Sequence, residues 1–98
     1  MRTEMIRKFD LTGKKAIITG VGSLEGIGRY LAEGLCESGA QVFLINRSER
    51  MYKVRYLFRE RGFAADCVVA DLTDRVQLDD AFRQSMELLG GRLDILVN

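Results

Sequence analysis

Four short apolar runs alternate along the chain with three longer stretches in which apolar and polar residues are mixed. The mixed stretches cover about residues 26–38, 48–61 and 74–89, and their apolar residues recur at a spacing that is typical of helices. The apolar runs are too short for helices and are typical of buried parallel strands. They are Lys15–Thr19, Gln41–Asn46, Cys67–Leu72 and Leu93–Asn98.

Strands that alternate with helices of this length are joined by right-handed crossovers and form a parallel sheet. The 98 residues suffice for one small domain. We therefore expect an α/β, Rossmann-like fold of three layers (α/β/α), with a parallel sheet of four strands in the order 3-2-1-4 and an N-terminal extension over residues 1–10. The apolar positions of the first two helices are Ile27, Leu31, Ala32 and Leu35, and Met51, Val54, Tyr56, Leu57 and Phe58. In the third helix we expect these residues to face inward: Val76, Leu78, Ala81, Phe82, Met86 and Leu89.

The last apolar run, Leu93–Asn98, forms an edge of the expected sheet. A strand that is apolar on both faces and unpaired along one side invites pairing with another chain. The sequence therefore predicts a homo-oligomer that is assembled through residues 93–98.

A glycine-rich loop, Thr19–Gly28, joins the first strand to the first helix. A pyrophosphate needs backbone N–H donors at close range, and a helix N-terminus supplies these donors together with a favourable dipole. Glycine is required where a side chain would block that approach, and Gly28 would let the helix pack close to the sheet. Because the loop follows a strand and opens a helix, it predicts a dinucleotide-binding site.

Motifs at four places resemble those of the short-chain dehydrogenase/reductase family, and the resemblance extends from Phe9 to Asn98. Residues 11–20 read LTGKKAIITG, and the loop ends on Gly26-Ile27-Gly28. Asp71-Leu72 matches the pair that follows the third strand in the family, and residues 93–98 (LDILVN) end on the first asparagine of its NNAG motif. Residues 21–25 form a longer loop than the family's, which has three residues at this place.

The resemblance implies an oxidoreductase that transfers a hydride between NAD(P)(H) and a carbonyl or alcohol substrate. Asp71 corresponds to the family's adenine contact, and it is equally suited to cap the next helix. Ser23 would bind a phosphate or the adenosine ribose, or would close the turn; Asn98 would line the cofactor site or have no fixed role. The candidate cofactor-binding residues are Gly20, Gly22, Ser23, Gly26, Ile27, Gly28, Asn46, Arg47, Asp71, Leu72 and Asn98.

The end of the second strand, Asn46-Arg47, bears on the choice between NAD and NADP. An acidic residue there binds the ribose 2′-OH of NAD, whereas a nearby arginine accommodates the 2′-phosphate of NADP. Arg47 favours NADP, with a solvated loop cation as the alternative interpretation. Glu25 opposes this choice, because it stands where NADP-dependent members of the family often carry a basic residue. The balance favours NADP.

The family's catalytic serine and its Tyr-x-x-x-Lys pair cannot be placed on this chain. Tyr30 is followed four residues later by Gly34, Tyr52 by Tyr56, and Tyr56 by Glu60, so we interpret the tyrosines as packing residues. We therefore expect the 98 residues alone to be catalytically incompetent. Three interpretations of the chain follow. It is the nucleotide-binding front half of an oxidoreductase, a nucleotide-binding module without catalysis, or a structural half that pairs with another chain.

Composition and charge limit the classes of binding partner to be expected. A formal net charge of +1 gives no reason to expect nucleic acid, and no apolar run reaches the length of a membrane span. The N-terminal residues lack the apolar core of a signal peptide. The absence of histidine removes the commonest metal ligand, so we expect no metal. Cys36 and Cys67 lie in apolar segments and are predicted to be buried, reduced thiols of a cytoplasmic protein.

Overall fold

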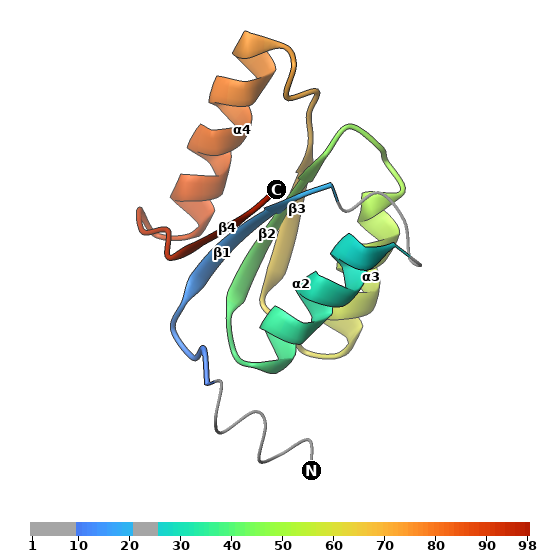
Figure 1. Ribbon diagram of the computed structural model, residues 1–98, viewed down its shortest axis with the longest axis vertical. Helices are drawn as coiled ribbons and strands as arrows, with labels where there is room; N and C mark the ends of the chain where they lie inside the picture. Colours follow the sequence, from blue (N-terminus) through green and yellow to red (C-terminus); the bar gives the residue numbers. More distant parts are fainter. Residues whose placement is uncertain (1–9, 21–25) are drawn as a thin grey trace.

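The computed structural model describes residues 10–20 and 26–98 (Figure 1). Its elements alternate between strand and helix. They are β1 (Lys15–Thr19), α2 (Ile27–Glu37), β2 (Gln41–Asn46), α3 (Met51–Glu60), β3 (Ala65–Val69), α4 (Arg75–Leu88) and β4 (Ile95–Val97). The four strands form one parallel sheet in the order β3-β2-β1-β4. The predicted fold class and strand order are confirmed.

Helices α2 and α3 lie on one face of the sheet and α4 lies on the other (Figure 1). The apolar residues form one cluster on each face. Ile18 and Leu44 pack in the cluster with α2 and α3, whereas their neighbours Ile17 and Phe43 pack in the cluster with α4. The central strands β1 and β2 therefore bury both faces, which explains why their sequences are apolar without alternation.

The outer strands differ from the predicted ranges. β3 begins at Ala65 and ends at Val69, not at 67 and 72, because Ala65 and Asp66 pair with β2 and the chain turns toward α4 after Ala70. β4 is limited to Ile95–Val97. An edge strand has one neighbour, and the strand is only as long as the segment that pairs with this neighbour. The length of the apolar run in the sequence therefore does not define the length of the strand.

Several of the apolar residues at helical spacing are exposed. Residues that are one helical turn apart line the buried stripe of each helix: Ala32 and Cys36 in α2, Met51, Val54 and Phe58 in α3, and Ala81 and Ser85 in α4. The exposed residues lie off these stripes, so the inward position predicted for Val76 and the packing role predicted for Tyr56 were wrong. The exposed residues are Ile27, Leu31, Tyr56, Leu57 and Val76.

The two cysteines are free thiols with different environments. Cys36 is buried in α2, and burial raises the pKa of its thiol to about 12. Cys67 lies on the edge strand β3 and is half-buried rather than buried, which corrects the prediction; burial also raises its thiol pKa.

Across residues 10–20 and 26–98, no helix is both long enough and apolar enough to cross a membrane.

Candidate functional site

The carboxyl ends of β1, β2 and β3 border a pocket of about 390 Å³. In a parallel sheet, the loops that follow the strands all meet at this edge, which is where doubly wound folds bind their ligands. The pocket is lined by Thr19, Gly20, Ile45, Asn46, Arg47, Ala70, Asp71, Leu72 and Thr73. Five of the predicted residues therefore lie around one cavity: Gly20, Asn46, Arg47, Asp71 and Leu72.

Gly20 forms the turn that leaves β1. Its φ of +82° lies in the left-handed region, where residues with a Cβ are strained. Among the described residues other than its chain neighbours, no atom lies within 4 Å of a Cβ added to Gly20. The glycine is thus required by the backbone conformation of the turn.

Asp71 is held in a fixed orientation just after β3. Its Oδ1 accepts hydrogen bonds from the Thr73 hydroxyl at 2.7 Å and from the Thr73 N–H at 2.9 Å. These bonds, in that order, and the positive charge of Arg47 lower the pKa of the Asp71 carboxyl, so the group is ionised at neutral pH. The residue that caps α4 is Asp74, so the alternative that Asp71 caps this helix was wrong.

Asn46 and Arg47 leave β2 beside Asp71. The side-chain Oδ1 of Asn46 accepts a hydrogen bond from the Ser48 N–H at 3.2 Å, and its carbonyl accepts one from the Ala70 N–H at 2.8 Å. Arg47 is exposed, with its charge close enough to lower the Asp71 pKa. This side of the pocket therefore presents one guanidinium and one carboxylate.

The N-terminus of α2 points to the same edge of the sheet. Gly26 is its N-cap residue with extended backbone angles, and among the described residues no side chain makes a capping hydrogen bond to this helix. The first turn of α2 holds no acidic residue that would offset the positive end of the helix dipole. Ile27 is exposed and Gly28 is half-buried in this turn. The predicted residues Gly22 and Ser23, like Glu25, lie outside the described residues.

Asn98 lies at the end of β4, next to the end of β1. The Thr19 hydroxyl donates to Asn98 Oδ1 at 3.2 Å and contacts the Val97 carbonyl at 3.4 Å. Thr19 thus lines the pocket and also contacts Asn98, although the sequence did not single it out as a site residue. Its position immediately before the first loop glycine was the available signal.

Three other pocket residues were missed: Ile45, Ala70 and Thr73. Each lies one or two positions from a predicted residue. Each contributes to the pocket wall or forms a hydrogen bond, but carries no charged group. Within the described part of the chain, no group of three or more His, Cys, Asp or Glu residues is placed to hold a metal ion.

Comparisons with known proteins all indicate the same protein family. A family model described as short chain dehydrogenase matches residues 14–98. Galactitol 2-dehydrogenase of Rhizobium johnstonii is 38% identical over 93 residues, which cover 94% of this chain and 35% of that protein. Oxidoreductase UcpA of Escherichia coli is 39% identical over 88 residues, which cover 90% of this chain and 32% of that protein. This chain thus spans about a third of the length of these curated relatives.

Solved structures agree with the sequence relatives. A hydroxysteroid dehydrogenase from Escherichia coli has a TM-score of 0.84 at 32% identity, covering 92% of this chain and 37% of its own. A gluconate 5-dehydrogenase from Burkholderia cenocepacia, solved in complex with NADP and tartrate, has a TM-score of 0.76 at 39% identity, covering 94% of this chain and 35% of its own.

Proposed function

Because this chain belongs to the short chain dehydrogenase family, we propose that its 98 residues form the NAD(P)-binding portion of an oxidoreductase. The observation that carries the proposal is the pocket at the carboxyl edge, which joins Gly20, Arg47 and Asp71. Supporting it, the uncapped N-terminus of α2 opens at the same edge of the sheet. The adenosine would occupy the pocket and the pyrophosphate would bind at the helix N-terminus.

The residues present fit the adenosine end of a dinucleotide. The ionised Asp71 carboxylate would accept a hydrogen bond from the adenine amino group, and the Arg47 guanidinium would bind the 2′-phosphate of NADP. The end of β2 carries no carboxylate to bind a ribose 2′-OH. On this basis NADP is the preferred cofactor.

Hydride transfer would require residues that this chain does not supply. The cofactor provides the hydride-accepting nicotinamide in the family reaction, and the family's catalytic serine and Tyr-x-x-x-Lys pair have no counterpart in the 98 residues. The described residues position the adenosine and the phosphates. The chain alone is therefore expected to bind the cofactor without catalysing reduction of a carbonyl.

Cofactor titrations by thermal shift test this function. Ligand that binds the folded state stabilises it by RT ln(1 + [L]/Kd), so NADP should raise the melting temperature more than NAD at equal concentration. We expect Arg47→Ala to weaken NADP binding on the order of tenfold, because a charge-assisted contact to the 2′-phosphate is lost, and to leave NAD nearly unchanged. Asp71→Ala should weaken both cofactors equally.

Arg75→Ala is the matched control, since Arg75 is an exposed arginine on α4 that does not line the pocket. If Arg47→Ala weakened NADP no more than NAD, the preference for NADP would be wrong. The absence of any shift with millimolar NADP, NAD or AMP would refute nucleotide binding itself.

A second proposal concerns β4, which pairs with β1 and forms one edge of the described sheet. Leu96 in its centre is 50% exposed. We propose that two copies of the 98-residue chain associate through this strand, which makes the chain a structural half as well as a binding module.

A further inference from the structure

The outer edge of β3 is the second edge of the sheet. The Val42 N–H donates to the Ala64 carbonyl, and the Ala70 N–H donates to the Asn46 carbonyl, so the even-numbered residues of this segment face β2. By alternation, the N–H and C=O groups of residues 67 and 69 and the carbonyl of Ala65 point outward, whereas the Ala65 N–H donates to the Phe63 carbonyl at 3.1 Å. Outward groups of this kind are a template for an added strand.

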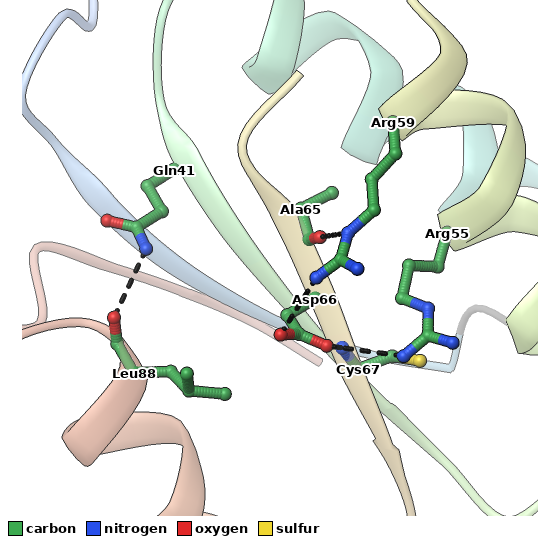
Figure 2. Close-up of polar contacts among 7 residues, drawn as sticks. All are labelled: Gln41, Arg55, Arg59, Ala65, Asp66, Cys67 and Leu88. Atoms are coloured by element: carbon green, nitrogen blue, oxygen red, sulfur yellow. Dashed lines mark hydrogen bonds and ion pairs between the residues drawn. The ribbon is translucent and has the colours of Figure 1, made fainter. Parts of the chain in front are cut away.

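Two charged side chains bind part of this outward backbone (Figure 2). The Arg59 Nε–H donates to the Ala65 carbonyl at 2.9 Å, and the Cys67 N–H donates to Asp66 Oδ1 at 2.8 Å. Arg59 also donates to Asp66 Oδ2 at 3.0 Å, which links the two side chains along the edge. Arg55 lies 3.5 Å from Asp66 Oδ1 and supports the carboxylate. We call Arg59 and Asp66 the edge pair.

The two members of the edge pair come from opposite faces of the sheet. Arg59 belongs to α3, and Cys67 packs in the cluster on the α2–α3 face. Val68 packs in the cluster with α4, and Asp66, two positions before it, is rooted on that same face. The contact between Arg59 and Asp66 therefore passes around the outside of β3.

The energies involved favour a role of the edge pair in preventing the addition of another strand to β3. The side chains of Arg59 and Asp66 are 54% and 29% exposed, and such a partly exposed ion pair contributes roughly 0–1 kcal/mol to folding. A strand that added to β3 would have to break both bonds to the backbone and cover two charged groups that had lost their partners. Uncompensated burial of charge is strongly unfavourable, so the edge pair opposes strand addition far more than it stabilises the fold.

The opposite edge has no such arrangement. The Asp94 N–H donates to the Lys15 carbonyl, so by the same alternation Ile95 directs its backbone groups outward from β4, whereas the Val97 carbonyl contacts the Thr19 hydroxyl of β1 at 3.4 Å. Among the hydrogen bonds of residues 10–20 and 26–98, none joins a charged side chain to the backbone of Ile95 or Val97. Within the described residues, charged side chains thus bind the outer backbone of β3 but not that of β4.

We propose that the edge pair, Arg59 and Asp66, closes β3 against pairing with a strand of a second copy of this chain. This step rests on the pairing through β4 proposed above: with β3 closed, copies of the 98-residue chain associate through the β4 edge alone and form a closed pair. A sheet with two open edges gives an open-ended assembly.

Sedimentation velocity on the 98-residue chain and a double variant, Arg59→Ala with Asp66→Ala, tests the proposal. The average mass of the variant is expected to keep rising with concentration, beyond the mass at which the wild type levels off. Arg83→Ala with Asp80→Ala is the matched control, because it removes an exposed Arg–Asp pair on α4, and it should sediment like the wild type. A folded edge-pair variant whose mass equals that of the wild type would overturn the proposal.

A charge-swapped variant, Arg59→Asp with Asp66→Arg, separates the bonds to the backbone from the ion pair. The swap keeps opposite charges, but an aspartate at 59 has no N–H for the Ala65 carbonyl and an arginine at 66 has no acceptor for the Cys67 N–H. We expect the swapped variant to associate like the double alanine variant. Wild-type behaviour of the swap would show that attraction between the charges alone suffices, and would refute closure through the backbone.

Hydrogen exchange on the unmodified protein gives a test that needs no variant to fold. The amides of Cys67 and Val69 both point outward, and Asp66 binds the Cys67 amide. The Cys67 amide should exchange on the order of tenfold more slowly than that of Val69, because it is hydrogen-bonded in the native state. Equal exchange rates at the two amides would contradict the proposal.

Discussion

Gly39 illustrates how one residue joins two parts of the chain. Its φ of +101° ends the turn after α2, and a Cβ there would meet Thr12 Oγ1 at 2.7 Å and the Thr12 backbone at 3.1 Å. Gly62 follows α3 with a similar φ of +81°, but a Cβ there would meet nothing within 4 Å. The two glycines therefore share a backbone requirement, and Gly39 alone of this pair also has a packing requirement.

We expect Gly62→Ala to lower the free energy of unfolding by about 1 kcal/mol, through the left-handed backbone alone. Gly39→Ala should lower it by more, because Thr12 must also move. Urea unfolding followed by circular dichroism compares the two variants directly. Equal losses would show that the close contact with Thr12 is relieved without strain.

Among the helices, α2 and α4 begin in different ways. Asp74 Oδ1 accepts hydrogen bonds from the Val76 N–H at 3.0 Å and the Gln77 N–H at 3.3 Å, so α4 starts with a side-chain cap. At the N-terminus of α2, by contrast, no side chain of the described residues makes a capping hydrogen bond. A helix whose first N–H groups are occupied by its own cap is suited to structure, whereas one without a cap leaves its donors for an anion.

Replacing the cap should therefore destabilise α4. Asp74→Ala is expected to lower the free energy of unfolding by about 1 kcal/mol, and Asp74→Ser should recover most of the loss because serine is also a good N-cap residue. Asp79→Ala serves as control, since Asp79 is 69% exposed and forms an i,i+4 ion pair with Arg75. A serine variant no more stable than the alanine variant, measured by urea unfolding, would argue against the cap.

At the scale of the whole molecule, the proposed association of two copies depends on which edge of the sheet is open. β3 has the edge pair, whereas β4 presents Leu96, which is 50% exposed. Pairing of two β4 strands around a twofold axis would bring the Leu96 side chains of both copies together and remove their apolar area from water.

Leu96→Lys is expected to weaken the dimer on the order of tenfold or more, because a charge replaces about 1.5–3 kcal/mol of apolar burial. Val76→Lys is the control: Val76 is 77% exposed in the first turn of α4 and belongs to neither edge strand. Sedimentation equilibrium measures both dissociation constants. A wild-type chain that remains a monomer at high concentration, or equal effects of the two substitutions, would contradict pairing through β4.

Local patterns in the sequence predicted the strands β1 and β2 and the alternation with helices correctly, and the alternation in turn predicted the strand order. Periodicity depends on residues close together in the chain, and a single sequence displays it. Of the candidate cofactor-binding residues, Gly20, Asn46, Arg47, Asp71 and Leu72 line one pocket, and their role in binding a cofactor stays a prediction.

The ends of β3 and β4, the exposure of Ile27 and Val76, the bonds of Asp71 to Thr73 and the edge pair required the folded structure. Each depends on which residues, often distant in sequence, become neighbours in space: Asp66 gains its role because β3 has a neighbour on one side alone. An Asp in a strand and an Arg in a helix look like ordinary surface charges in the sequence. Their hydrogen bonds to the β3 backbone arise from packing of α3 against the sheet, because the two side chains meet only where that sheet ends.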